Sequence, residues 1–209
     1  MIDKFLRAKH WQLFILMFGF PFLLQMLMMG SLFSSIISDP DSAPTSIFSM
    51  FYLFPIIMII YTGALFGWFW SIAIGLQQYV PENISMKTSR FKVFFFIPLV
   101  YIILISILTG ISFNSLLFEP GVEPSGGMIA SMVGIIIPLH LLSMFGIFHS
   151  MYFVAKTLKT VLLQKEAHFG EYVGEFFMLW FYIIGLWIIQ PKINKIVEGQ
   201  SPDPNTIDG

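Results

Sequence analysis

Long, uninterrupted stretches of apolar residues dominate this sequence, and the polar residues are gathered in short segments between them. Five apolar stretches can be recognised, at about residues 11–37, 47–76, 91–113, 128–158 and 173–189. About 20 helical residues cross the hydrocarbon core of a bilayer, so the first four are long enough to span it. Strands of a membrane barrel would instead alternate in polarity over about ten residues. The pattern predicts an all-α fold, a polytopic bundle of transmembrane helices forming a single domain over residues 1–190.

The fifth stretch, residues 173–189, is shorter than the others and rich in aromatic side chains. Its length of about 17 residues is at the lower limit for a span. Trp and Tyr side chains, which it contains, favour the headgroup level of a membrane. We expect this stretch to span the bilayer; the alternative is a segment that lies in the interface or re-enters. The polar residues 191–209 that follow are expected to be a disordered tail.

Basic residues occur in alternate connectors of the predicted bundle. The N-terminal segment and the second and fourth connectors contain Lys4, Arg7, Lys9, Lys87, Arg90, Lys92, Lys156, Lys159 and Lys165. The first connector contains Asp39 and Asp41, the third contains Glu119 and Glu123, and neither contains a basic residue. Lys and Arg accumulate on the cytoplasmic side of membrane proteins. We therefore expect the N-terminus in the cytoplasm.

The overall composition excludes several classes of protein. Of the 209 residues 56% are hydrophobic and 11% are charged, whereas a soluble domain has about 25% charged residues. A soluble enzyme is therefore excluded. Eleven basic and 12 acidic residues give a net charge of −1, which leaves no basic footprint for nucleic acid. The absence of cysteine excludes disulfides and thiolate chemistry.

Each of the four long stretches contains one proline, and two of the stretches share a motif. Pro21, Pro55, Pro98 and Pro138 are candidate kinks, because proline removes a backbone donor and clashes with the preceding turn. The hexamers FGWFWS at residues 66–71 and FGIFHS at 145–150 agree at four positions. They indicate either a duplicated two-helix hairpin, as in some transporters, or a coincidence of composition.

Polar residues within the apolar stretches are few, and such residues are often functional. Gln25 lies in the first stretch, and His140 and His149 lie in the fourth. They could line an intramembrane polar path, although a histidine bonded to a neighbouring helix is the more ordinary role. No Asp, Lys or Arg lies deep in a predicted span, which counts against ion-coupled transport.

Two further groups of residues have spacings with a physical meaning. His168, Glu171 and Glu175 would share one helix face and could hold a metal ion, but acidic residues in the first helical turn are more often explained by the helix dipole. Gly63, Gly67, Ser71 and Gly75 form a ridge of small residues at every fourth position. Such ridges let helices approach closely in lipid, so this one predicts tight packing within the chain or a dimer face.

The segment GEFFMLWFYIIGLWIIQPKINK at residues 174–195, with FVAKT at 153–157, resembles the ending of a group of small bacterial integral membrane proteins. The resemblance covers about a quarter of the chain and implies a bacterial inner membrane. No activity accompanies it, so it assigns no site residue.

The sequence contains none of the common hydrolase, metalloprotease or nucleotide-binding motifs that we sought. We expect no catalytic residue and no cofactor, although an intramembrane Ser–His pair would escape such a search. The favoured function is a non-catalytic accessory or scaffold subunit of an inner-membrane complex, in contact with lipid and with a membrane-protein partner or a second copy. The alternative is a small transporter or channel built from the duplicated hairpin.

Overall fold

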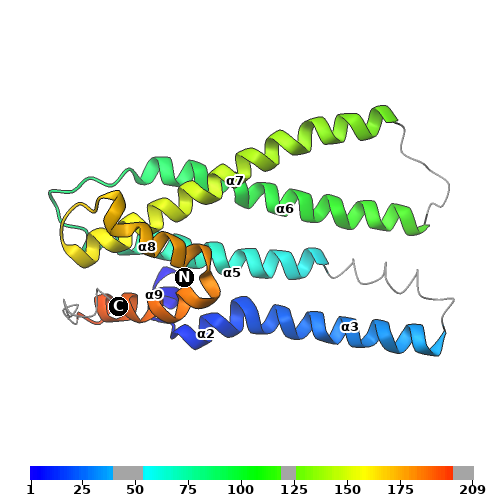
Figure 1. The fold of residues 1–209 in the computed structure, drawn as a ribbon, viewed down its shortest axis with the longest axis horizontal. Helices are drawn as coiled ribbons and strands as arrows, with labels where there is room; N and C mark the ends of the chain where they lie inside the picture. Colours follow the sequence, from blue (N-terminus) through cyan, green and yellow to red (C-terminus); the bar gives the residue numbers. More distant parts are fainter. Residues whose placement is uncertain (40–53, 119–125, 200–209) are drawn as a thin grey trace.

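A computed structural model describes residues 1–39, 54–118 and 126–199, and every regular element in these ranges is a helix (Figure 1). The elements are α1 (Ile2–Arg7), α2 (His10–Phe14), the π-helix η1 (Ile15–Gly19), α3 (Phe20–Ser38), α5 (Phe54–Gly75), the 3-10 helix η3 (Leu76–Tyr79), α6 (Thr88–Phe118), α7 (Gly126–Leu163), α8 (Phe169–Trp180) and α9 (Tyr182–Val197). The predicted all-α bundle is confirmed. Residues 47–53 of the predicted second stretch, Asp41, Glu119 and Glu123 of the connectors, and residues 200–209 of the tail lie outside the described ranges.

Four helical stretches of the described chain are long and apolar enough to cross a membrane. They are His10–Ser38, Pro55–Tyr79, Thr88–Thr109 and Val133–Leu163. The long helices run along the long axis of the molecule, and α6 and α7 diverge away from their crossing (Figure 1). These stretches correspond to the four long apolar segments of the sequence, because length and apolarity are local properties of the chain.

The four predicted kink sites have different local structures. Pro98 and Pro138 lie inside α6 and α7. Pro21 follows the π-helix, in which the Phe20 amide bonds to the Ile15 carbonyl five residues earlier. A proline disturbs the backbone ladder of the turn before it, and a π-bulge is one way to absorb the disturbance. Pro55 is the second residue of the described part of α5.

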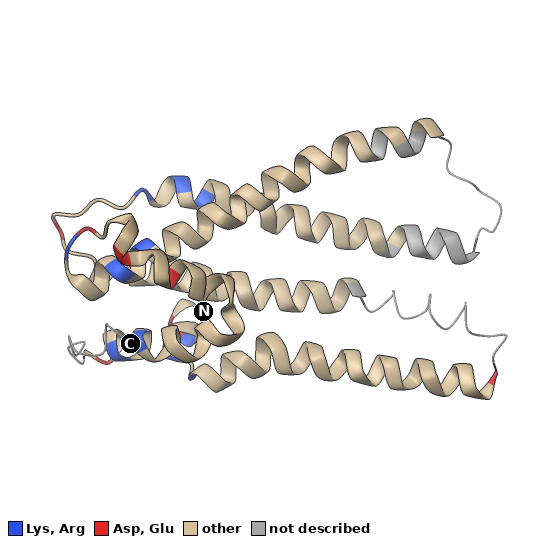
Figure 2. Cartoon of the chain, viewed as in Figure 1, with Lys and Arg blue, Asp and Glu red and all other residues tan. Residues whose placement is uncertain are grey.

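Basic side chains are concentrated at one end of the bundle. Figure 2 shows the Lys and Arg residues at one end of the bundle, near the N-terminus and helices α8 and α9. The start of α6 and the end of α7, which we call the base of these helices, lie at the same end. We call this the basic end. Asp39, at the end of α3, lies at the opposite end (Figure 2). The separation agrees with the alternation of charge between connectors, because antiparallel neighbours bring every second connector to the same side.

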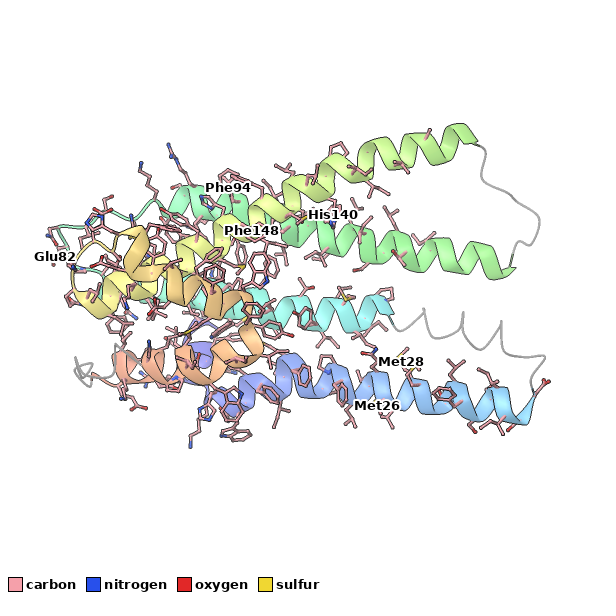
Figure 3. All side chains as sticks on the ribbon, viewed as in Figure 1. Met26, Met28, Glu82, Phe94, His140 and Phe148 are labelled. Carbon is pink, nitrogen blue, oxygen red and sulfur yellow. The ribbon has the colours of Figure 1, made fainter. Side chains whose placement is uncertain are left out.

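The buried core also lies toward the basic end (Figure 3). Its largest fully buried side chains come from α1, α5, α6, α7, α8 and α9, and include Leu6, Trp68, Phe91, Leu158, Leu179 and Ile189. In contrast, α3 has no buried residue. Half of the most apolar window of Pro55–Tyr79 is buried, against 11% for His10–Ser38. α5 is therefore the central helix, and α3 is peripheral.

The fifth apolar stretch does not form one continuous helix. α8 has 12 residues and α9 has 16, and between them Phe181 leaves the helical conformation at φ −90°, ψ 54°. α9 folds back along α8 to the basic end (Figure 1). This hairpin requires Gly185, since a Cβ there would collide with the Met178 carbonyl oxygen. The fifth stretch is therefore a helical hairpin and not one continuous spanning helix.

The expected start of the disordered tail also needs correction. α9 continues through Pro191 to Val197, so residues 191–197 are helical. Ile193 and Ile196 belong to the core. A polar composition concealed this face, because the apolar residues recur only at helical spacing.

Candidate functional site

The three candidate metal ligands, His168, Glu171 and Glu175, have two different structural roles. His168 is the N-cap of α8, and its backbone amide donates to Glu171 Oε2 at 2.8 Å. Glu171 also pairs with Lys165, and this ammonium group holds the pKa of the Glu171 carboxyl below its usual range. No group of three His, Asp or Glu residues in the described ranges is arranged to hold a metal ion. His168 and Glu171 therefore cap a helix, because a residue at the N-cap is not yet on the helix face that the spacing assumed.

Glu175, the third member of the trio, is buried between two lysines. Its Oε1 atom lies 3.3 Å from Lys159 Nζ and 3.6 Å from Lys192 Nζ. Lys159 belongs to α7 and Lys192 to α9, so one carboxylate joins three helices. Removing one partner of a buried ion pair leaves an uncompensated charge, so this network stabilises the α8–α9 hairpin against α7.

The three residues of the proposed polar path do not share a cavity. Gln25 is exposed on α3. His140 is exposed on α7, and its Nδ1 lies 3.1 Å from the Tyr101 hydroxyl (Figure 3). Only His149 lines one of the two cavities described below. Gln25 thus lies on a different helix from the two histidines, which contact two different side chains of α6, Tyr101 and Phe94.

The small-residue ridge of α5 receives the N-terminal helix α1. A Cβ at Gly67 would lie 2.9 Å from Phe5 Cζ, and one at Gly75 would lie 2.8 Å from Leu6 Cδ1. Ser71 is buried between them, whereas a Cβ at Gly63 would meet nothing within 4 Å. Most of the ridge is therefore used for packing within the chain, and small side chains allow it because they let the two helices approach closely.

The two FG-containing hexamers have the same local structure. Ser71 Oγ donates to the Gly67 carbonyl at 2.7 Å, and Ser150 Oγ donates to the Gly146 carbonyl at 2.8 Å. Gly146 is the crossing point of α7 with α6, where a Cβ would lie 2.7 Å from the Phe94 carbonyl oxygen. In both hexamers the glycine allows a close approach, and the serine bonds back to it.

A buried glutamine that the sequence analysis passed over joins α9, α5 and α1. Gln190 is fully buried, and its Oε1 accepts a hydrogen bond from Trp68 Nε1 at 2.8 Å. Its Nε2 donates to the carbonyls of Phe5, Leu6 and Ala8 at 2.9 to 3.2 Å. These carbonyls lie where α1 ends, so the amide replaces hydrogen bonds that the helix terminus lacks.

Asn194, one turn after Gln190 on α9, supports the same contact. Its Nδ2 donates to the Leu6 carbonyl at 2.9 Å and to the Ala8 carbonyl at 3.2 Å. The spacing of four residues between Gln190 and Asn194 was a signal available in the sequence, because such residues lie on the same side of a helix. Its significance depended on knowing that α1 lies opposite.

One cavity, which we call the basic cavity, lies at the base of α6 and α7. Its volume is about 310 Å³, and its polar lining consists of Ser85, Lys87, Arg90, His149, Tyr152, Lys156 and Glu166. Lys156 Nζ lies 2.8 Å from Glu166 Oε1, and this contact holds the pKa of the Glu166 carboxyl below its usual range. The sequence predicts that the second and fourth connectors lie on the same side of the membrane. It does not predict that their side chains surround a common cavity.

A second cavity, also of about 310 Å³, is lined mostly by apolar side chains of α5, α6, α7 and α8. Its hydroxyl groups come from Tyr61, Thr62 and Tyr182. No charged side chain lines it. Its lining is therefore mainly apolar and contains no carboxylate, imidazole or amine.

The outward surface of α3 is the third candidate. All its described side chains are exposed or half-buried, including Met26 and Met28 (Figure 3). Gln25 is exposed near the middle of the His10–Ser38 stretch. No hydrogen bond joins its amide to another residue in the described part of the chain. The helix thus presents an amide without a hydrogen-bond partner among exposed apolar side chains, and the exposed serines of α3, Ser31, Ser34 and Ser38, lie nearer its end.

No protein-family model, curated protein or solved structure matches this sequence.

Proposed function

We propose that this chain is a non-catalytic accessory or scaffold subunit of a complex in the bacterial inner membrane, and that α3 is the helix that contacts its partner. The observation that carries the proposal is the exposed Gln25 amide on a helix with no buried residue. The other long helices contribute buried residues to the core. α3 is therefore the long helix with the smallest share of its surface packed against the rest of the described chain.

The cost of an unsatisfied amide in lipid supports a partner. Moving an amide from water into an apolar environment without a hydrogen bond costs roughly 2–7 kcal/mol. Side chains of this type are found at helix–helix contacts in membranes, where they bond across the interface. A transmembrane helix of another polypeptide, lying along α3, would satisfy Gln25 and bury the apolar side chains beside it.

The distribution of polar residues favours a subunit over a transporter or channel. Gln25 and His140 are exposed and line neither cavity, whereas His149 lines the basic cavity; a continuous path would need the three to converge. The apolar cavity contains no charged group that could bind an ion. The two hexamers that suggested a duplicated hairpin serve helix packing at Gly67 and Gly146.

The proposed location and orientation rest on charge and on the resemblance of residues 174–195. All Lys and Arg side chains lie at one end of the bundle, together with the N-terminus (Figure 2). We place this end in the cytoplasm, because basic residues remain on that side during insertion. The resemblance to small bacterial membrane proteins supports the inner membrane.

The test is native mass spectrometry of the chain after gentle extraction from its source membrane, for the unmodified protein and two variants. Gln25→Leu removes the amide, and Leu23→Ala alters an exposed residue on the opposite side of α3. We expect a complex heavier than the 23.9 kDa chain that contains one other membrane polypeptide in fixed stoichiometry. Gln25→Leu should release that polypeptide, and Leu23→Ala should retain it.

Each other result contradicts the proposal. A mass that is a multiple of the single chain would assign the α3 surface to self-association. A monomer that carries a small molecule would favour transport. A stoichiometric partner that both variants retain equally would show that the subunit contact lies away from Gln25.

A further inference from the structure

We propose that the basic cavity binds the phosphate headgroup of an anionic phospholipid. This inference is independent of the α3 surface, because the cavity is formed by the base of α6, the C-terminal half of α7 and the connectors beside them. Basic pockets between transmembrane helices at the cytoplasmic surface are a recurring type of lipid-headgroup site.

The charge of the lining calls for an anion. Lys87, Arg90 and Lys156 contribute three positive charges, and Glu166 contributes one negative charge. Glu166 is paired with Lys156, while Lys87 and Arg90 form no ion pair with any residue in the described ranges. A phosphate diester carries one negative charge and would offset one of the two remaining positive charges, and a guanidinium group matches the geometry of phosphate oxygens.

The histidine in the lining lacks a hydrogen-bond partner. His149 Nδ1 is buried, and no group in the described part of the protein bonds to it. Buried polar atoms are nearly always paired, so this nitrogen is an exception within the lining of the cavity. The imidazole borders the cavity, while its Nδ1 atom is shielded from it.

The surroundings favour a lipid over free phosphate. The Phe94 ring packs on His149 with a centroid distance of 4.3 Å and on Phe145 with a distance of 5.3 Å (Figure 3 labels Phe94). Phe145 is 55% exposed. These aromatic side chains lead from the polar cavity along α6 and α7 toward the middle of the apolar spans. A molecule with a phosphate group and hydrocarbon chains can use both surfaces, whereas inorganic phosphate can use only one.

The close crossing of α6 and α7 maintains this arrangement. Gly146 meets the Phe94 carbonyl and Pro98, so the helices are in contact one turn from His149. The basic side chains of the two helix ends are therefore held near one another despite their mutual repulsion. The residues of the basic cavity are therefore positioned by the packing of two helices, α6 and α7.

The test is native mass spectrometry of the purified full chain in detergent, titrated with dioleoyl phosphatidylglycerol, dioleoyl phosphatidylcholine or inorganic phosphate. We expect phosphatidylglycerol to be retained in preference to phosphatidylcholine. Arg90→Gln should weaken its retention about fivefold and Arg90→Gln with Lys87→Gln about 25-fold, from the usual contribution of one cation at a membrane surface. Glu166→Gln should strengthen retention, because it removes the negative charge from the lining.

Lys195→Gln is the matched control, since Lys195 is an exposed cation at the same end of the bundle but outside the cavity. Its retention of phosphatidylglycerol should equal that of the unmodified chain. Arg90 and Lys87 are exposed, so these variants should unfold at the same temperature as the control.

Three results would overturn the proposal. Equal loss of lipid in Lys195→Gln and Arg90→Gln would reveal general attraction to a basic surface. Equal retention of the two lipids would show that net charge is not recognised. Displacement of phosphatidylglycerol by an equal concentration of inorganic phosphate would assign the cavity to a free anion.

Discussion

Replacing Gln190 with leucine should destabilise the bundle by removing the hydrogen bonds that connect α9 to α5 and α1. The variant deprives the fully buried Trp68 indole of its acceptor and removes the amide that bonds the Phe5 carbonyl. A buried donor or acceptor that loses its partner costs about 1–3 kcal/mol, so two such groups should lower the free energy of unfolding by about 2–6 kcal/mol.

Asn194→Ala provides a quantitative comparison within the same contact. The Leu6 and Ala8 carbonyls that Asn194 bonds are also within reach of Gln190. Because both carbonyls keep a donor, this variant should cost only about 0.5–1.5 kcal/mol, the net value of an ordinary hydrogen bond. Comparison of the two variants thus distinguishes the free-energy cost of an unsatisfied buried group from the cost of losing one hydrogen bond.

The assay is unfolding in mixed micelles with increasing dodecyl sulfate, followed by far-ultraviolet circular dichroism. A double-mutant cycle with Trp68→Phe isolates the indole–amide bond, because the packing cost of the smaller ring cancels. Once the donor is absent, Gln190→Leu should cost about 1–3 kcal/mol less than it does in the unmodified chain. Additive effects, or equal destabilisation by Gln190→Leu and Asn194→Ala, would refute the role assigned to the glutamine.

Two glycine substitutions test the close approaches on which the basic end depends. Gly185→Ala should destabilise the protein by about 3 kcal/mol or more, because its Cβ would overlap the Met178 carbonyl. Gly174→Ala is the control, since a Cβ there meets no neighbour within 4 Å. Equal unfolding temperatures for the two variants would contradict the close contact in the α8–α9 hairpin. Gly67→Ile should displace α1 at a cost of about 1–3 kcal/mol and raise hydrogen exchange at residues 2–7, whereas Gly63→Ile should leave the exchange there unchanged. Unaltered protection of α1 in Gly67→Ile would show that the ridge is not its binding surface.

Several features of the candidate sites could be predicted only in part. The alternation of Lys and Arg between connectors predicted that Lys87, Arg90 and Lys156 lie at the same end of the bundle, because insertion depends on charge along the chain. Their convergence on one cavity depends on the crossing of α6 and α7 at Gly146. The helical spacing of His168, Glu171 and Glu175 suggested one ligand set. Capping at the start of α8 and burial beside two lysines separated it.

The N-terminal segment shows why a polar composition was misleading. Ile2, Phe5 and Leu6 lie at helical spacing among charged residues, and this pattern was available in the sequence. The pattern did not lead to the prediction of a helix, because a six-residue helix is not stable alone. α1 is held by the Gly67–Gly75 side of α5 and by Gln190 and Asn194 of α9. The position of α1 depends on residues more than 180 positions away, so it cannot be predicted from the local sequence of residues 2–7.

Residue order alone was sufficient for the helical class, for four long membrane-crossing segments and for the grouping of basic connectors, since each depends on apolar length or on charge within one segment. Tertiary packing decided the rest. The break at Phe181, the return of α9 along α8 and the burial of Gln190 all require contacts between distant segments. In a bilayer, apolar residues suit a helix that spans and a helix that folds back equally well. The choice between them rests on close approach at glycine and on the satisfaction of buried polar groups, which only the assembled bundle provides.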